Sequence, residues 1–362
     1  MTDSVIDTAA AVRPGEELNT PAVDRWLKQH VDAVQGKPLQ GSPKVTQYSG
    51  GASNWTYCLS YENCELILRR APAGTKAKGA HNMQREYNLQ KILKPVYRYV
   101  PQALAYCADE SVTGSDFYVM EKLVGVIPRK NMPRGMELDE ATVGTLCKNA
   151  LDSLIALHKV DYKAAGLSEL GKGEGYIARQ IEGWSQRYRD AKTWNVSEAR
   201  QVIEWLERNQ PSREIICITH NDFRFDNLVL DPNDPTQING VLDWELATLG
   251  DPLMDLGNSL AYWVEPGDDF LARNTRRQPT HLPGMMTRQQ VVDYYLGQTG
   301  FEVDSFTFYE VYGLFRLAGI AQQIYYRYHH KQTDNPAFKG FWLFVNYLIW
   351  RCHRAIKQEG KK

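Results

Sequence analysis

The sequence predicts an α+β protein with a small lobe built on an antiparallel sheet and a larger, mainly helical lobe. One observation is that short apolar segments of strand character, separated by turn residues, recur between residues 44 and 124. Another is that apolar residues recur at helical spacing after about residue 133. A chain of 362 residues can bury a core in each of two lobes. We therefore expect lobes over residues 19–124 and 125–362, preceded by a flexible segment over 1–18.

The composition argues against several classes of protein. Charged residues make up 23% of the chain and the formal net charge is −1, so neither nucleic acid nor a membrane surface is expected as a partner. No secretory signal is recognised at the start, and no apolar run approaches the roughly 20 residues that span a bilayer. Six cysteines without a CxxC pair argue against zinc and favour reduced thiols in a cytoplasmic protein. The oligomeric state stays open.

The expected elements of the first lobe begin with a helix over residues 20–34, for which Thr20 is the predicted N-cap and Pro21 suits the first turn. Two strands follow from Lys44 around a Ser-Gly-Gly-Ala-Ser turn. The segment ELILRR, residues 65–70, reads as a third strand. These strands form the expected sheet.

A prominent helix is predicted over the segment MQREYNLQKIL. Glu86, Leu89 and Leu93 share one of its faces, so Glu86 points toward the surface on which the helix packs. The following segment DFYVMEKL reads as another strand that ends near Val124. The first lobe is thus expected to combine several strands with one helix, and the Glu86 carboxylate of that helix is expected to face the sheet.

The second lobe is predicted to be mainly helical. Apolar residues over 142–160 form the stripe of a long amphipathic helix, on which His158 is expected to be a core residue. Short apolar strands return between about 215 and 244, and helices resume from Pro252. Asp251 and Asp255 are expected to cap and tie a helix.

The strongest signal lies in the segment ITHNDFRFDNLVL. An expected strand leads into His220 and Asp222, and Asn227 follows five positions after that aspartate. Two more short strands follow, and the second delivers Asp243. We expect the strand ends of one small sheet to bring Asp222, Asn227 and Asp243 together.

These residue types suit phosphoryl transfer. One carboxylate would accept the proton of an attacking hydroxyl group, while an amide oxygen and a second carboxylate would hold Mg²⁺ on the phosphates. Asn and Asp provide the hard oxygen ligands that Mg²⁺ prefers. The alternative, that these residues only form turns, suits any one of them. The whole pattern, His-x-Asp-x-x-x-x-Asn before a strand that ends in Asp, favours the catalytic interpretation.

The segments HNDFRFDNLVL and VLDWELATLGDPLMDLG resemble the catalytic and metal-binding segments of the aminoglycoside phosphotransferase and choline kinase-like family. The branch fused to acyl-CoA dehydrogenases is the most similar. The resemblance implies a protein-kinase-like bilobal fold, with ATP as cosubstrate and Mg²⁺ as cofactor. It also implies Asp222 as the catalytic base, Asn227 and Asp243 as metal ligands, and His220 as an organiser of the loop.

The first lobe fits this resemblance in its turn and its third strand. Gly50, Gly51 and Ser53 lie where a kinase folds a loop over the phosphates, although such turns are also common in ordinary sheets. The third strand carries Arg69 where kinases usually have a lysine, and Glu86 is its expected partner. Arginine keeps the charge but presents a planar fork, so the exchange is not neutral.

The expected hinge is the segment FYVMEKLVG. The resemblance assigns backbone groups of Glu121 to Leu123 to the adenine edge.

Asn221 replaces the usual glycine of His-Gly-Asp, and asparagine tolerates the unusual backbone conformation expected there. Glu245 is interpreted equally well as a contact near the metal or as an ordinary carboxylate at a helix start.

The acceptor is expected to be a small molecule with a hydroxyl group. Arg276, Arg277 and Arg316 are candidate substrate residues, with Arg273 in the same expected loop as the first two. They favour a neutral or anionic acceptor such as a hydroxyacid or hydroxyacyl thioester, although Arg276 and Arg277 also suit a solvated loop. A nucleotide-binding protein with little kinase activity and an aminoglycoside-modifying resistance kinase remain alternatives, as does GTP in place of ATP.

Overall fold

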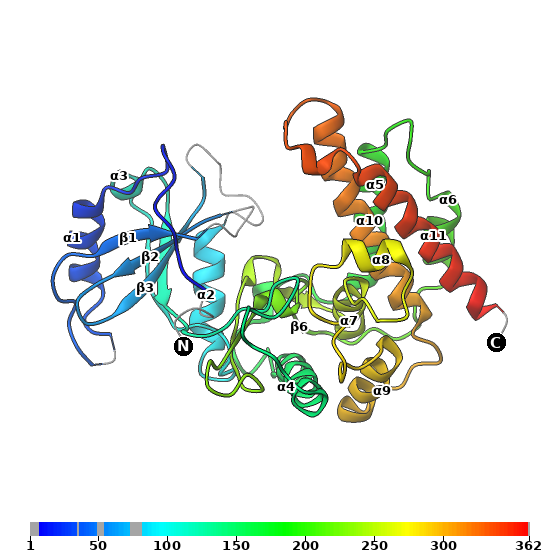
Figure 1. Ribbon diagram of the computed structural model, residues 1–362, viewed down its shortest axis with the longest axis horizontal. Helices are drawn as coiled ribbons and strands as arrows, with labels where there is room; N and C mark the ends of the chain where they lie inside the picture. The colour runs from blue at the N-terminus through cyan, green and yellow to red at the C-terminus, as the bar shows by residue number, and fades with distance from the viewer. Residues whose placement is uncertain (1–6, 35, 49–53, 73–81, 361–362) are drawn as a thin grey trace. The chain divides into compact units, whose positions relative to one another are not determined.

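The computed structural model describes residues 7–34, 36–48, 54–72 and 82–360 (Figure 1). The chain groups into two compact units. Unit 1 contains Met1–Ser153, Lys163–Leu167 and Phe225–Leu246, and unit 2 contains Leu154–Tyr162, Ser168–Arg224 and Ala247–Lys362. The chain therefore passes between the units several times, whereas the lobes predicted at 19–124 and 125–362 assume a single boundary.

Unit 1 is built on a five-stranded sheet in the order β1-β2-β3-β5-β4, in which all neighbouring strands are antiparallel. Its strands are β1 (Lys44–Gln47), β2 (Trp55–Ser60), β3 (Glu65–Arg70), β4 (Ala103–Cys107) and β5 (Phe117–Glu121). The central strand β3 is buried along most of its length because β2 and β5 flank it. The expected antiparallel sheet is therefore present, with β4 as a strand that the sequence pattern did not indicate.

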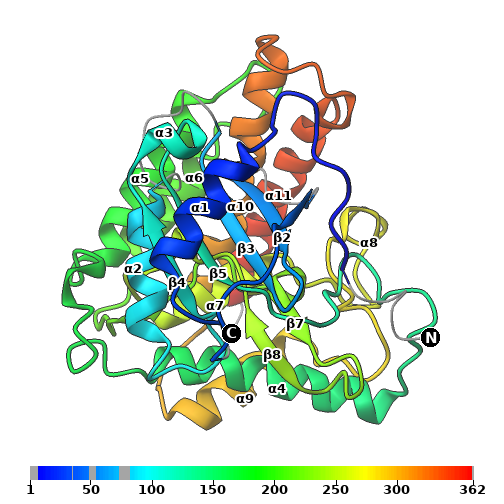
Figure 2. The ribbon, with the colours of Figure 1, turned by 90° about the vertical axis from the view of Figure 1, so that its left-hand side faces the viewer.

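The helices of unit 1 cover both faces of this sheet. Helix α1 (Thr20–His30) lies over one face, as Figure 2 shows, and it buries Val23 and Leu27 in the core. Helix α2 (Met83–Leu93) packs Met83 against strand residues of the other face. A short helix α3 (Glu110–Thr113) precedes β5. The predicted inward face of α2 is confirmed, since its buried residues include Glu86, Leu89 and Leu93.

The start of unit 1 differs from prediction in two details. The N-cap of α1 is Asn19 and not Thr20, because the Asn19 side chain accepts a hydrogen bond from the Ala22 amide. The segment before α1, which was expected to be flexible, pairs with the sheet, since Ala10 forms two backbone hydrogen bonds with Gln47. The Tyr57 hydroxyl also donates to the Glu16 carbonyl. These contacts place residues 10–16 against β1 and β2.

A separate hairpin of unit 1 joins β7 (Leu228–Leu230) to β8 (Ile238–Val241). The short 3₁₀ turns η4 (Phe225–Asn227) and η5 (Trp244–Leu246) flank it. A Cβ atom on Gly240 of β8 would lie 2.1 Å from the Leu123 side chain and 3.0 Å from the Tyr99 carbonyl oxygen. The hairpin thus packs closely against the segment that follows β5.

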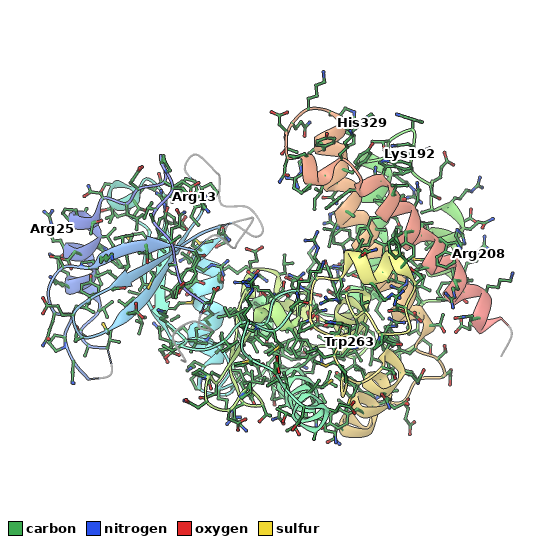
Figure 3. All side chains as sticks on the ribbon, viewed as in Figure 1. Arg13, Arg25, Lys192, Arg208, Trp263 and His329 are labelled. Atoms are coloured by element: carbon green, nitrogen blue, oxygen red, sulfur yellow. The ribbon has the colours of Figure 1, made fainter. Side chains whose placement is uncertain are left out.

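Unit 2 is mainly helical (Figure 1). It contains the end of α4, together with α5 (Tyr176–Asp190), α6 (Arg200–Arg208), α7 (Pro252–Ala261), α8 (Phe270–Thr275), α9 (Arg288–Thr299), α10 (Thr307–His329) and α11 (Phe341–Glu359). Helix α4 (Glu140–His158) begins in unit 1 and ends in unit 2. Two short 3₁₀ turns, η3 (Ser168–Leu170) and η6 (Pro336–Phe338), complete the unit. Figure 3 shows Trp263 among these helices, where it is buried.

Helices α7 and α10 approach each other through glycines. A Cβ atom on Gly313 would lie 2.1 Å from the Gly257 carbonyl oxygen, and one on Gly257 would lie 2.4 Å from that of Tyr309. Larger side chains at either position would therefore push the helices apart. This close contact fixes α10 beside the helix that carries Asp255.

The expectation of one small sheet carrying the three candidate residues is wrong. Strand β6 (Cys217–Thr219) pairs with β9 (Thr248–Gly250) in unit 2, whereas β7 pairs with β8 in unit 1. The reason is that Thr248–Gly250 is itself a strand and provides the partner of β6. No helix in the described part of the chain has the length and apolar character needed to cross a membrane.

Candidate functional site

Arg69 forms the centre of a cluster of charged groups in unit 1. Its Nη1 lies 3.3 Å from Glu86 Oε1, and its Nη2 lies 3.4 Å from Asp243 Oδ1 and 3.5 Å from Glu245 Oε2. The arginine is buried, at 8% exposure. Burial alone would lower the pKa of Arg69, but the negative charge of Glu86 holds that pKa above its ordinary value. The guanidinium therefore stays charged and binds three carboxylates at once.

Glu86 is held inward by α2 and the sheet. The Tyr118 hydroxyl donates to Glu86 Oε1 over 2.8 Å, and Gln90 Nε2 donates to that hydroxyl over 2.9 Å. The register places Arg69 opposite Tyr118, so neighbouring strands supply both partners of the glutamate. The predicted pairing of Arg69 with Glu86 is present in the structure.

Asn227 and Asp243 lie at the same end of the β7–β8 hairpin. The Leu242 amide donates to the Asn227 carbonyl over 2.8 Å, which extends the pairing by one step. Asp243 has a φ of 67°, a left-handed conformation that is unusual for a residue with a side chain. Such a conformation costs about 1–3 kcal/mol and persists where surrounding contacts impose it. Both residues line the same cavity.

Glu245 belongs to this cluster and also lies in the first turn of η5. Asn54 Nδ2 donates to Glu245 Oε2 over 2.9 Å, and the Arg85 guanidinium donates to the Glu245 carbonyl over 3.3 Å. Sequence reasoning did not identify Asn54; its position at the end of the predicted phosphate loop was the available signal. Gly50, Gly51 and Ser53 of that loop lie outside the described residues.

A cavity of about 180 Å³ in unit 1 is lined by three of the four predicted nucleotide residues that the structure describes, Arg69, Glu121 and Leu123, but not by Glu86. Its lining includes Arg69, Met120, Glu121, Leu123, Asn227 and Asp243. The amide of Glu121 donates to the Gln102 carbonyl over 2.9 Å, so this backbone donor already has an acceptor within the protein. The side chain of Glu121 accepts from Lys94. Among the predicted hinge residues, Leu123 is therefore better placed than Glu121 to provide a backbone donor.

The residues around Asp243 fit a divalent cation. The carboxylates of Glu86, Asp243 and Glu245 share the guanidinium group of Arg69, whereas the Arg85 guanidinium donates to the backbone carbonyl of Glu245. Burial raises the pKa of Glu86 and the charge of Asp243 raises it further, although Arg69 opposes both effects. The cluster is thus short of positive charge. Carboxylate and amide oxygens in the same cavity are the ligands that Mg²⁺ prefers.

We expect loss of the Arg69 charge to destabilise the protein strongly. Replacing Arg69 with methionine should lower the free energy of unfolding by about 3–5 kcal/mol, because buried carboxylates lose their counter-charge. Arg25→Met on α1 is the matched control, since Arg25 is exposed and labelled in Figure 3. Urea unfolding of both variants measures the difference. Equal unfolding curves for the two variants would contradict a structural role for the Arg69 cluster.

Unit 2 holds His220 and Asp222 on the loop after β6. The Asp222 amide donates to His220 Nδ1 over 3.2 Å, and His220 is fully buried. Asn221 has a φ of 63°, which confirms the unusual conformation predicted at this position. Tyr176 donates its hydroxyl hydrogen to the Asn221 side chain over 3.1 Å. The loop is therefore tied to its surroundings at Asn221, directly before Asp222.

Asp255 anchors this loop from α7. Its carboxylate accepts the amide hydrogens of His220 over 2.7 Å and Asn221 over 2.8 Å. His158 Nε2 lies 3.1 Å from Asp255 Oδ2, and His158 Nδ1 lies 2.6 Å from the Tyr295 hydroxyl. Burial would raise the pKa of Asp255, but the hydrogen bond and charge of His158 hold it below its ordinary value.

The expected helix-capping role is correct for Asp251, whose side chain accepts from the Leu253 and Met254 amides. Asp255 has a different role. It lies inside α7 and binds the loop that carries Asp222. Asp255 and His158 were predicted only as structural residues, and their connection to the loop required the packing of α4 and α7.

The three candidate substrate arginines have different surroundings. Arg316 is buried on α10, donates to the Asn221 carbonyl over 2.9 Å and lies 5.3 Å from the Trp184 ring centre. This contact favours support of the loop over direct substrate binding. Arg276 ends α8 and donates to the Gln278 carbonyl, while Arg277 is exposed. Arg273, which was expected in a loop, lies within α8.

The fold and these residue clusters define a phosphotransferase of the protein-kinase-like class. A model of the phosphotransferase enzyme family, APH, matches residues 44–287. The chain therefore belongs to the phosphotransferase enzyme family, and the resemblance to aminoglycoside phosphotransferases and choline kinase is confirmed.

Solved structures agree with this assignment. A putative aminoglycoside phosphotransferase from Ralstonia eutropha JMP134 matches with a TM-score of 0.79 and 28% identity, over 94% of this chain and 99% of that one. Choline kinase from Cryptosporidium parvum Iowa II matches with a TM-score of 0.63 and 13% identity, over 94% and 97% of the two chains. The predicted α+β, protein-kinase-like fold is confirmed.

A curated relative extends the similarity to longer proteins. Acyl-CoA dehydrogenase family member 10 of Mus musculus is 33% identical over 318 residues, which are 87% of this chain. The chain spans 29% of the length of that relative. The similarity therefore concerns one part of the longer protein.

Proposed function

We propose that this protein transfers the γ-phosphoryl group of ATP, in the presence of Mg²⁺, to a hydroxyl group of a small molecule. The observation that carries the proposal is the buried Arg69 cluster, which joins Glu86 of α2 to Asp243 beside a cavity in unit 1. In a member of this family, the carboxylates of such a cluster can bind a cation and its guanidinium group can bind the phosphates of a nucleotide. Positioning and charge neutralisation then provide most of the catalysis.

In the proposed reaction, Asp222 acts as the general base. The acceptor oxygen attacks the γ-phosphorus, the bond between that phosphorus and the β–γ bridging oxygen breaks, and ADP leaves. The hydroxyl proton goes to the Asp222 carboxylate. Asn227 and Asp243 would hold Mg²⁺, which supplies positive charge to the phosphate oxygens when bound. Arg69 and Leu123 would contact the nucleotide in this proposal.

The proposed acceptor is a hydroxyacid or hydroxyacyl thioester. The similarity to a protein named for the acyl-CoA dehydrogenase family supports an acyl compound. Arg276 and Arg277 support an acceptor without positive charge, because neighbouring cations would repel a polycation. Aminoglycosides remain the second class to test, since a solved relative of 28% identity carries that name.

Nucleotide-dependent thermal stabilisation tests the proposed site. ATP at about 100 times its Kd should stabilise the wild type by about 2.7 kcal/mol in the presence of Mg²⁺, because nucleotide and metal bind only the folded state. Asp243→Ala should lose most of the metal-dependent part, whereas the exposed Asp32→Ala control should behave as wild type. GTP in place of ATP measures the nucleotide preference.

The outcomes separate the candidate functions. Stabilisation followed by ADP release with a hydroxyacid or hydroxyacyl thioester supports the proposal, and ADP release with aminoglycosides alone selects the second class. Stabilisation without turnover of any acceptor would instead indicate a nucleotide-binding protein with little kinase activity. A wild type that no nucleotide stabilises would contradict the nucleotide site.

A further inference from the structure

Arg224 binds the carboxylate of the residue two positions earlier. Its Nη2 lies 3.2 Å from Asp222 Oδ2, and the two side chains are only 19% and 18% exposed. The carbon of the Arg224 guanidinium lies 4.7 Å from the centre of the Tyr262 ring. Tyr262 is the residue at which α7 ends. A single guanidinium therefore connects the Asp222 carboxylate to the end of α7.

This connection acts on the side chain of Asp222, whereas the bonds from Asp255 and Arg316 act on the backbone of the loop. Asp255 binds the amides of His220 and Asn221, and Arg316 binds the Asn221 carbonyl. These bonds fix the peptide groups of His220 and Asn221, and they do not involve the Asp222 carboxylate. An arginine that stacks on a ring has a fixed plane, and it restrains the orientation of a carboxylate bound at its edge.

We propose that Arg224, clamped on Tyr262, is a positioning residue that holds the Asp222 carboxylate in one orientation for proton transfer. The inference rests on the proposed function, in which Asp222 accepts the hydroxyl proton. The ion pair engages Oδ2 of the Asp222 carboxylate. Sequence reasoning did not single out Arg224, because an arginine two positions after an aspartate is unremarkable until the ring of Tyr262 lies beside it.

A double-mutant cycle tests whether Arg224 acts through Asp222. Arg224→Gln should lower kcat about 10- to 100-fold, with the KM for ATP unchanged, because a misoriented base slows the chemical step and leaves nucleotide binding intact. In the Asp222→Asn background the same change should have no further effect. The assay measures the release of ADP from radiolabelled ATP in the presence of Mg²⁺. The phosphoryl acceptor is water, or the hydroxyl compound that the screen of acceptors identifies.

Substitutions of the ring give a second test that keeps the Arg224 charge. Tyr262→Leu removes the stacking surface and should lower kcat in the same direction as Arg224→Gln, whereas Tyr262→Phe keeps the ring and should retain kcat. Arg224→Lys keeps the charge without the planar fork and should fall between wild type and Arg224→Gln. If Arg224→Gln fails to fold, this series still decides the question.

Arg208→Gln on α6 is the matched control, since Arg208 is 76% exposed and extends from its helix as Figure 3 shows. Its kcat should equal that of the wild type. An equal loss from Arg224→Gln with and without Asp222 would overturn the inference and assign Arg224 a direct role. An unchanged kcat in Arg224→Gln would also overturn it. A wild type that releases no ADP would overturn the proposed function itself, and therefore the premise of the inference.

Discussion

Replacing Asp222 with asparagine is expected to lower the rate of phosphoryl transfer by about 10²–10⁴-fold, the usual contribution of a general base. The asparagine side chain has the same size, but it cannot accept the hydroxyl proton. The loop should keep its conformation, because its bonds to Asp255 and Arg316 come from the backbone of His220 and Asn221. ADP release at saturating ATP and acceptor measures the effect.

Nucleotide binding separates loss of the base from loss of the site. The Kd for ATP in the presence of Mg²⁺ should stay within about twofold of the wild type, because the Arg69 cluster lies in unit 1 and does not include Asp222. Asp190→Asn, at an exposed position on α5, serves as the matched control and should keep its full rate. An Asp222→Asn variant with wild-type turnover would exclude Asp222 as the base.

Removal of the Asp255 carboxylate is expected to destabilise the protein strongly. Asp255→Ala should lower the free energy of unfolding by about 3–5 kcal/mol, because it leaves His158 and two loop amides without their buried acceptor. The same change should abolish turnover, since the loop that carries Asp222 loses its anchor. Urea unfolding and ADP release measure the two effects. The exposed Asp293→Ala on α9 is the control, and equal stability of the two variants would contradict the anchor.

The pH dependence of the Asp255 contribution follows from the direction of its pKa shift. The pKa of Asp255 in the folded protein lies below the ordinary value, because His158 outweighs the effect of burial. Its stabilising contribution is therefore fully present above the unfolded-state pKa of about 3.9 and is lost as the pH falls through the lower folded-state pKa. The stability difference between wild type and Asp255→Asn should narrow below about pH 4. A difference that stays constant on acidification would contradict this linkage.

Some parts of the candidate site could be predicted from local patterns. Helical periodicity placed Glu86 on the packed face of α2, whereas its pairing with Arg69 was expected from the family resemblance. The replacement of glycine by Asn221 predicted a left-handed residue, which the φ of 63° confirms. These predictions succeeded because they depend on spacing within one element or on the conformational limits of one residue.

Other parts depended on contacts between distant segments. Arg69 and Asp243 are 174 positions apart, and Asn54 and Glu245 are 191 apart. The strand β6 was assigned to the wrong sheet because its partner, Thr248–Gly250, is only three residues long and has no distinctive pattern. From the sequence, Arg316 is a candidate substrate residue. Its hydrogen bond to the Asn221 carbonyl joins positions 95 apart, so no local pattern indicates that contact.

The sequence by itself determined the family, the division into a strand-rich part followed by a mainly helical part, and the residue types that can carry phosphoryl transfer. Spacing and side-chain chemistry are local properties, so they can be read along the chain. The tertiary structure decided that Glu245 joins the Arg69 cluster, that Asp255 anchors the loop and that Tyr262 lies beside Arg224. Those contacts form only when separate segments pack into one core, where buried polar groups must find partners whatever their distance in the sequence.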